Sequence, residues 1–129
     1  FERFYGNVPF GKIVHSSVLI DPSAQVLAGS VIYPGGLLDA RVTVSENTIL
    51  NICCSIAHDS SIGKHCFLSP RVAIAGFVSV SEKCIIGINA TLIDNISITP
   101  NVQIGAGTVV TKSITTPGLY VGNPHRFVR

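Results

Sequence analysis

The sequence is poor in charged residues and has no long apolar run. Charged residues make up 12% of its 129 residues, and nine basic against seven acidic side chains give a formal net charge of +2. So weak and scattered a balance argues against nucleic acid or an anionic membrane surface as a partner. No stretch approaches the length of a membrane span, and no basic and apolar leader opens the chain, so we expect a soluble, cytoplasmic protein.

Metal-binding spacing is absent as well. The sequence has four cysteines and four histidines, but no Cys-x-x-Cys and no Cys/His pair at zinc spacing. The sequence therefore predicts no metal.

The chain starts at Phe1 and not at a methionine, which suggests a processed product or a fragment from which an N-terminal domain was removed.

A six-residue repeat dominates what the sequence does contain. Steps of six from Ile56 land only on Ile, Leu or Val: Val14, Ile20, Val26, Ile32, Leu38, Val44, Leu50, Ile56, Ile62, Leu68, Ile74, Val80, Ile86, Leu92, Ile98, Ile104 and Val110. The residue two before each step is mostly small or β-branched. A period of six is a multiple of two, so the marked residues share one strand face.

Hexads of this kind indicate an all-β chain, a parallel β-helix whose strands turn corners and whose coils stack. Three hexads per coil place residues 18 apart above one another, at about 4.8 Å. We expect an N-terminal cap or linker over residues 1–12, the repeat over 13–115 and a C-terminal cap or tail over 116–129. Because no loop leaves the repeat, any site must lie on the prism faces or between prisms.

Two cysteines are placed so that they stack. Cys66 and Cys84 are 18 residues apart at the small inward position, whereas Cys54 belongs to another face. Distance alone permits a disulfide between Cys66 and Cys84, but we expect a reduced, structural pair.

Several motifs resemble one family of hexapeptide acyltransferases. The chain has Asn51-x6-His58-Asp59, then Ile62-Gly63, Ser69-Pro70, Ala75-Gly76 and Ile86-Gly87, and later Ile104-Gly105-Ala106-Gly107 with Val109-Val110-Thr111-Lys112, and Gly122-Asn123-Pro124. This pattern is similar to that of the sialic-acid O-acetyltransferases and bacillosamine-pathway N-acetyltransferases, and the resemblance covers roughly residues 13–126.

The resemblance implies more than the periodicity does. It implies a left-handed β-helix, a homotrimer with acetyl-CoA bound between subunits, and a nucleotide-linked or surface-polysaccharide sugar as acceptor. It also implies an N-terminal nucleotide-sugar-binding domain that the sequence lacks. Which sugar is acetylated, and whether at nitrogen or oxygen, stays open.

The chemistry of acetyl transfer points to His58. The acceptor must lose a proton as it attacks the thioester, and histidine is suited to take it near neutral pH. We expect His58 to point outward, with the Asp59 carboxylate or a backbone carbonyl holding Nδ1 and leaving Nε2 free. Asn51 is expected to approach a neighbouring subunit's His58. The alternatives are a plain surface histidine and, for Asn51, a corner residue that tolerates left-handed backbone.

The family holds the pantetheine arm of the cofactor against backbone amides, and the matching positions are Gly76, Ile88 and Ala106. Small residues suit this task because a thin chain lies against backbone only where no side chain intervenes. Lys112 is a candidate for binding a CoA phosphate. The alternatives are ordinary corner geometry for the glycines and a solvated side chain for Lys112.

The chain departs from the family at two positions: Phe67 stands where a second histidine is common, and Arg71 replaces a glycine after Ser69-Pro70. The same fold allows two alternative functions. A zinc enzyme of the γ-carbonic anhydrase type needs three interface histidines, two of them about five residues apart, whereas His58 and His65 are seven apart and no suitable third histidine is evident. A non-catalytic trimerisation or regulatory module is compatible with the fold alone.

Overall fold

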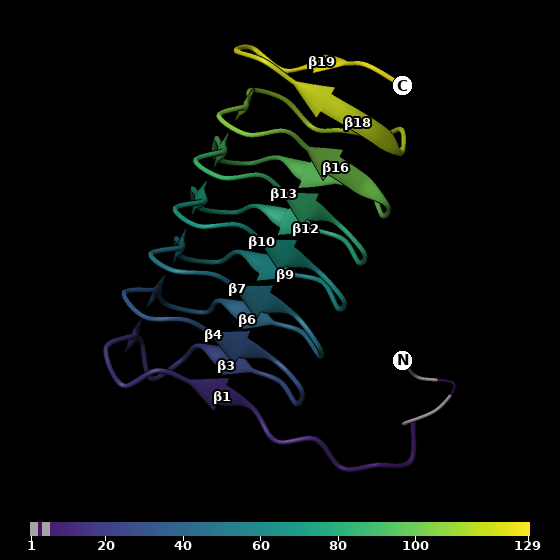
Figure 1. Cartoon of the computed structure of the whole chain (residues 1–129). Coiled ribbons are helices and arrows are strands. Elements are labelled where there is room, and N and C mark those ends of the chain that lie inside the picture. Colours follow the sequence, from purple (N-terminus) through teal and green to yellow (C-terminus); the bar gives the residue numbers. More distant parts are fainter. Residues whose placement is uncertain (1–2, 4–5) are drawn as a thin grey trace.

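The strands form three flat faces around a common core (Figure 1). The computed structural model describes Arg3 and residues 6–129. Face A contains β1 (Ile13–Val14), β4 (Val31–Ile32), β7 (Ile49–Leu50), β10 (Phe67–Leu68), β13 (Ile85–Ile86), β16 (Val102–Ile104), β18 (Gly118–Val121) and β19 (Arg126–Phe127). Face B contains β2 (Leu19–Ile20), β5 (Leu37–Leu38), β8 (Ser55–Ile56), β11 (Ala73–Ile74), β14 (Thr91–Leu92) and β17 (Val109–Val110). Face C contains β3 (Gln25–Val26), β6 (Thr43–Val44), β9 (Ser61–Ile62), β12 (Ser79–Val80) and β15 (Ser97–Ile98).

Three hexads make one coil, as the sequence predicts. From β1 to β17 the paired residues are 18 apart, for example Ile56 with Ile74 on face B and Ile62 with Val80 on face C, whereas β18 pairs with β16 at a spacing of 16. All pairings are parallel except that of β19 with β18. Over the described residues, no helix is long and apolar enough to cross a membrane.

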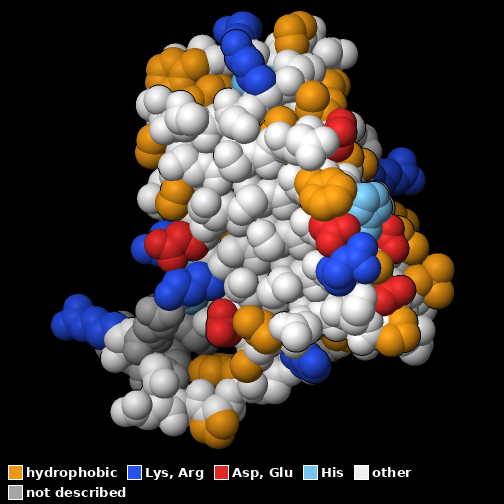
Figure 2. Space-filling model, turned by 180° about the vertical axis from the view of Figure 1, so that it is seen from behind, with side chains coloured by type: hydrophobic (Ala, Val, Ile, Leu, Met, Phe, Trp, Pro, Cys, Tyr) orange, Lys and Arg blue, Asp and Glu red, His pale blue; other side chains and the backbone are white. Residues whose placement is uncertain are grey.

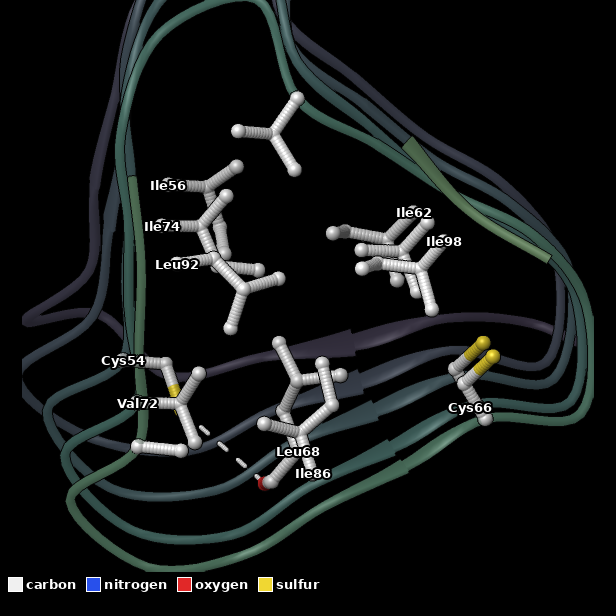
Figure 3. Close-up of a cluster of buried hydrophobic side chains, with 14 of the residues drawn as sticks. Cys54, Ile56, Ile62, Cys66, Leu68, Val72, Ile74, Ile86, Leu92 and Ile98 are labelled. Carbon is white, nitrogen blue, oxygen red and sulfur yellow. Dashed lines mark hydrogen bonds between the residues drawn. The ribbon is translucent and has the colours of Figure 1, made fainter. Parts of the chain in front are cut away.

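The repeated aliphatic residues fill the interior (Figure 3). Ile56, Ile74 and Leu92 stack in one column, Ile62 and Ile98 in a second, and all five are buried. The first coil is the exception, because Ile20 is exposed and Val14 only partly buried. Among the described residues, no further strand pairs with the outer edge of that coil.

The small inward residues complete the corners. Hydroxyls and thiols at these positions donate to the carbonyl 15 residues later, as Ser60 Oγ does to Ala75 at 2.8 Å and Thr48 Oγ1 to Gly63 at 2.8 Å. Cys66 and Cys84 do the same at 3.2 Å to Ser81 and 3.4 Å to Thr99. Both are free thiols, as predicted. The hydrogen bond with Cys84, together with burial, raises the pKa of the Cys66 thiol.

A left-handed residue recurs once per hexad. Positive φ values of 55° to 78° occur at Gly29, Gly35, Arg41, Asn47, Cys53, Asp59, His65, Arg71, Phe77, Lys83, Asn89, Asn95, Asn101 and Gly107. Glycine and asparagine adopt this conformation most readily. Asn51 is not among these residues, so the alternative that made it a left-handed corner residue is wrong.

The Ile-Gly pairs of the repeat have a packing reason. A Cβ on Gly87 would lie 2.6 Å from the Ala106 nitrogen, and one on Gly63 would lie 2.6 Å from the Glu82 nitrogen. Side chains do not fit there, because backbone from the next coil occupies the space. These glycines therefore serve the stacking of coils.

The C-terminal segment covers the last coil. β18 pairs with β16, Ile114 bridges to Ile98 on face C, and Gly122 accepts a hydrogen bond from the Val109 nitrogen on face B. Tyr120 is buried over the core, and its hydroxyl donates to Thr116 at 2.7 Å. At the other end, the Gly11 carbonyl and the Lys12 ammonium bond to the first coils. Residues 1–2 and 4–5 of the expected cap or linker lie outside the described residues.

Candidate active site

The predicted base lies at the corner where face B turns into face C, which we call the B–C corner. His58 follows β8 by two residues and points outward, as predicted, with 48% of its side chain exposed. Ile56 before it and Ser60 after it are buried. The alternation of the hexad thus fixes the imidazole at the surface while its neighbours anchor the backbone.

Asp59 holds the imidazole from one side. Its Oδ2 lies 2.9 Å from His58 Nδ1, which is the arrangement that leaves Nε2 directed away from the carboxylate. Asp59 is in the left-handed conformation, with φ of 60°. Because successive residues bond to each other across a tight corner, this geometry depends on that backbone conformation.

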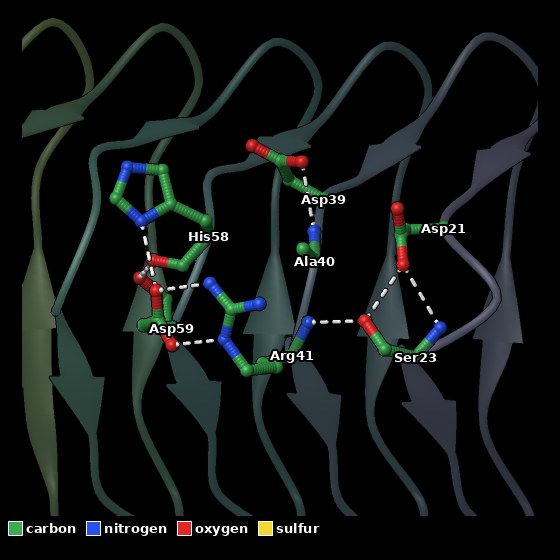
Figure 4. A network of polar contacts seen from close by, with 8 residues as sticks. Asp21, Ser23, Asp39, Ala40, Arg41, His58 and Asp59 are labelled. Atoms are coloured by element: carbon green, nitrogen blue, oxygen red, sulfur yellow. Dashed lines mark hydrogen bonds and ion pairs between the residues drawn. The ribbon is translucent and has the colours of Figure 1, made fainter.

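Arg41, which the sequence analysis did not identify, binds the same carboxylate (Figure 4). Its Nε donates to Asp59 Oδ1 at 2.6 Å, and its second guanidinium nitrogen to Oδ2 at 3.0 Å. Hydrogen bonds from Arg41 and then His58 lower the pKa of Asp59 to about 2. Arg41 is 18 residues before Asp59, so a search of the residues stacked above and below the predicted site would have found it.

Gly76 and Phe77, from the next coil, pack against the same ring. A Cβ on Gly76 would lie 2.8 Å from His58 Cε1 and 3.0 Å from Nε2. Phe77 meets the imidazole edge-on, with ring centroids 5.3 Å apart and planes at 86°. Phe77 is exposed and has φ of 57°, an unusual conformation for a bulky residue. Gly76 therefore contacts the predicted base, and its missing side chain makes room for it.

The other predicted residues are divided between two corners. Lys112 lies on the B–C corner, three coils further along than His58. Asn51, Ile88 and Ala106 lie on the corner between faces A and B, here the A–B corner. Asn51 Oδ1 accepts a hydrogen bond from the Ile52 nitrogen. Within one chain the structure does not bring the A–B residues to His58.

The A–B corner is open to solvent beside the predicted cofactor residues. Ile88 and Ala106 are exposed, and among the described residues nothing other than its chain neighbours lies within 4 Å of a Cβ built on Gly107. Arg71 adopts φ of 61° on this corner, a backbone conformation that glycine adopts without steric cost. Phe67 lies in β10 with its ring exposed on face A and not at the B–C corner.

The remaining histidines lie apart from His58. His15 Nδ1 and the Ser17 hydroxyl are 2.8 Å apart, and His65 lines a hollow on face A with Phe10 and Phe67. Burial, followed by the charge of Lys112, lowers the pKa of His125. The described residues contain no group of three His, Cys, Asp or Glu side chains that would hold a metal ion.

The faces beside these corners differ in polarity. Figure 2 shows a histidine next to acidic, cationic and apolar side chains at one edge of a broad face that has few apolar or charged side chains. The outward residues of face C are Gln25, Thr43, Ser61, Ser79 and Ser97. Those of face A are apolar along most of its length: Ile13, Val31, Ile49, Phe67 and Ile85.

Comparison with known proteins identifies several sugar acyltransferases as similar. No protein-family model matches the chain. A UDP-3-O-acylglucosamine N-acyltransferase of Bordetella avium is 33% identical over 118 residues, which are 91% of this chain and 32% of that protein. The chain thus spans about a third of the length of the curated relatives it matches.

Two solved structures have the same architecture. PerB of Caulobacter crescentus, in complex with CoA and GDP-perosamine, superposes with a TM-score of 0.92 at 28% identity, covering 94% of this chain and 58% of that one. The acetyltransferase domain of PglB from Neisseria gonorrhoeae, in complex with acetyl coenzyme A, has a TM-score of 0.91 at 23% identity, covering 95% and 60%. The predicted left-handed hexapeptide β-helix and the resemblance to sugar acyltransferases are confirmed.

Proposed function

We propose that this chain is the acetyl-transferring β-helix of a hexapeptide-repeat sugar acyltransferase, which moves an acetyl group from acetyl-CoA to an amino or hydroxyl group of a nucleotide-linked sugar. One observation carries the proposal: an outward histidine whose Nδ1 is held by a carboxylate, on a prism similar to PerB, whose structure holds CoA and GDP-perosamine.

In the proposed reaction, His58 acts as the general base. With an amine acceptor, the amine nitrogen attacks the thioester carbonyl carbon, a C–N bond forms and the C–S bond breaks. His58 Nε2 takes the proton that the nitrogen loses and passes it to the leaving thiolate, which gives CoA. Asp59 keeps the proton of the neutral ring on Nδ1 and stabilises the imidazolium that forms.

Copies of the chain complete the site in this proposal. His58 and Gly76 lie on one corner and Asn51, Ile88 and Ala106 on the other, so a second copy must bring its A–B corner to the first copy's B–C corner. The exposed apolar residues of face A, such as Ile85 at 46% exposure, suit burial between copies. We propose a homotrimer with one site at each interface.

The proposed path of the cofactor follows these corners. The pantetheine arm would lie over Ile88 and Ala106, where the surface is open beside Gly107. Asn51 would hydrogen-bond the acceptor or the thioester carbonyl, and Lys112 would pair with a phosphate of CoA. Gly76 contributes by leaving the space that the imidazole occupies.

A thiol-release assay tests the proposal. The purified chain is mixed with acetyl-CoA and a GDP- or UDP-linked amino sugar, or its hydroxyl counterpart, and both CoA release and the acetylated product are measured. We expect acetylated product from the unchanged chain. In His58→Asn we expect the rate to fall by about 100-fold or more. If the folded chain binds no acetyl-CoA in calorimetry and releases no CoA, the transferase proposal fails and the non-catalytic module replaces it.

A further inference from the structure

A continuous chain of polar contacts reaches His58 from two coils away (Figure 4). Asp21 Oδ1 accepts from Ser23 Oγ at 2.6 Å, and Ser23 Oγ accepts from the Arg41 backbone nitrogen at 2.8 Å. The Arg41 guanidinium then binds Asp59, which holds His58. Ser23, Arg41 and Asp59 occupy the same position of successive coils, so the stacking of the prism aligns the whole chain.

The Arg41 fork uses both oxygens of the carboxylate. Oδ1 accepts from Nε, while Oδ2 accepts from the second guanidinium nitrogen and lies 2.9 Å from His58 Nδ1. A carboxylate bound only by the imidazole can rotate about its Cβ–Cγ bond. One bound by a two-pronged guanidinium has its plane fixed, because the two parallel hydrogen bonds require it.

We propose that Arg41 is a positioning residue for the reaction: its fork fixes the Asp59 carboxylate so that Nδ1 of His58 carries the proton and Nε2 stays available as the base. This inference rests on the proposed function for its kinetic consequences, but the tautomer of His58 can be observed without any reaction.

The charge of Arg41 also acts on the carboxylate beside the base. The guanidinium offsets part of the negative charge of Asp59, which lies next to the imidazole. The charged groups along the B–C corner are Asp21, Asp39, Arg41, Asp59, Asp94 and Lys112. Of these, the structure shows only Asp59 bonded directly to the imidazole.

A purely structural role for the ion pair makes different predictions. The Arg41 side chain is 64% exposed, and exposed ion pairs contribute little to stability. We therefore expect Arg41→Gln to leave the melting temperature nearly unchanged. Its effect should instead appear in kcat and in the tautomer of His58.

The experiment compares Arg41→Gln, Arg41→Lys, Asp59→Asn and the double variant Arg41→Gln/Asp59→Asn with the unchanged chain. Lys83→Gln is the matched control, because Lys83 is an exposed cation at the same hexad position on the corner between faces C and A. For Arg41→Gln we expect kcat to fall about 10-fold, with KM for acetyl-CoA unchanged. Arg41→Lys should restore only part of this, since an ammonium makes no fork.

One further readout separates positioning from general damage, because a merely structural role would leave the tautomer of His58 unchanged. In ¹⁵N spectra, with the signal assigned by His58→Asn, the neutral ring should be protonated at Nδ1 in the unchanged chain and mixed in Arg41→Gln.

The double variant shows whether Arg41 acts on kcat through Asp59. If Arg41 acts through Asp59, Arg41→Gln lowers kcat little further once Asp59 is Asn. Additive losses or an unchanged His58 tautomer in Arg41→Gln would overturn the inference. An inactive unchanged chain would refute the proposed function instead, and the ¹⁵N readout would still test Arg41.

Discussion

At the scale of single residues, His58 is held by the residue that follows it in sequence and by two residues of the next coil. Asp59 binds its Nδ1, Gly76 lies against the ring and Phe77 meets its edge. Positioning of this kind matters because small displacements of a reacting group lower rates steeply. The proposed base therefore depends on Asp59 and also on two residues that take no part in the chemistry, Gly76 and Phe77.

Gly76→Ala tests this packing. The new Cβ would lie 2.8 Å from His58 Cε1, so the ring must move. We expect kcat to fall about 10-fold or more and the melting temperature to drop slightly. In a His58→Ala background the same change should leave the melting temperature unaltered, because the clash is gone. An equal drop in both backgrounds would show that the ring does not fill this space.

The pH dependence of stability tests the Asp59 contacts. Asp59 has a pKa lowered to about 2 in the folded chain, chiefly by Arg41, against about 3.9 when unfolded. A lowered folded pKa stabilises the chain above the unfolded pKa, and the stabilisation disappears as pH falls toward about 2. Because the contact is exposed and screened by solvent, the unchanged chain should lose only slightly more stability than Asp59→Asn between about pH 5 and pH 2, measured by urea midpoints. Parallel curves would contradict the contacts.

The sequence predicts part of this site. The adjacency of His58 and Asp59 and the outward direction of His58 follow from the hexad pattern and were predicted. The sequence pattern did not reveal the fork from Arg41, because that contact depends on which residues stack 18 apart. It did not reveal the contact with Gly76 either, because the glycine was expected only to leave space for the cofactor. The catalytic and cofactor roles of all these residues stay predictions.

At the scale of the repeating element, the hexad joins two requirements. Its inward residues fill the core, and one residue in six takes a left-handed conformation. The core follows from the sequence, because aliphatic periodicity reports burial directly. The left-handed positions do not follow from the sequence, since they include Phe77, Lys83 and Arg71 as well as glycines and asparagines, which adopt this conformation readily.

Lys83→Asn tests the energetic cost of that conformation. Lys83 has φ of 58° and an exposed side chain. Asparagine tolerates left-handed backbone better than lysine does, so we expect the free energy of unfolding to rise by about 0.5 kcal/mol. Gln25→Asn in β3, where φ is not positive, should give no such gain. Equal effects of the two substitutions in urea unfolding would contradict the explanation.

At the scale of the whole molecule, the chain is a uniform prism with unequal faces. Face C carries mostly serine and threonine outward, whereas face A carries Ile13, Phe67 and Ile85, with 67%, 38% and 46% of their surface exposed. The candidate residues occupy two corners that one chain does not bring together. The sequence predicts the prism, but the proposal that prisms associate depends on the family resemblance, because periodicity describes one chain.

Complementation between two inactive chains tests the central claim most directly. His58→Asn removes the proposed base on the B–C corner, and Ala106→Trp blocks the proposed cofactor path on the exposed A–B corner. Each variant alone should be inactive. When both are co-expressed and purified together, random mixing leaves about a quarter of the interfaces with two intact corners, so about a quarter of the activity of the unchanged chain should return. No recovery from verified mixed oligomers would contradict a site built between copies.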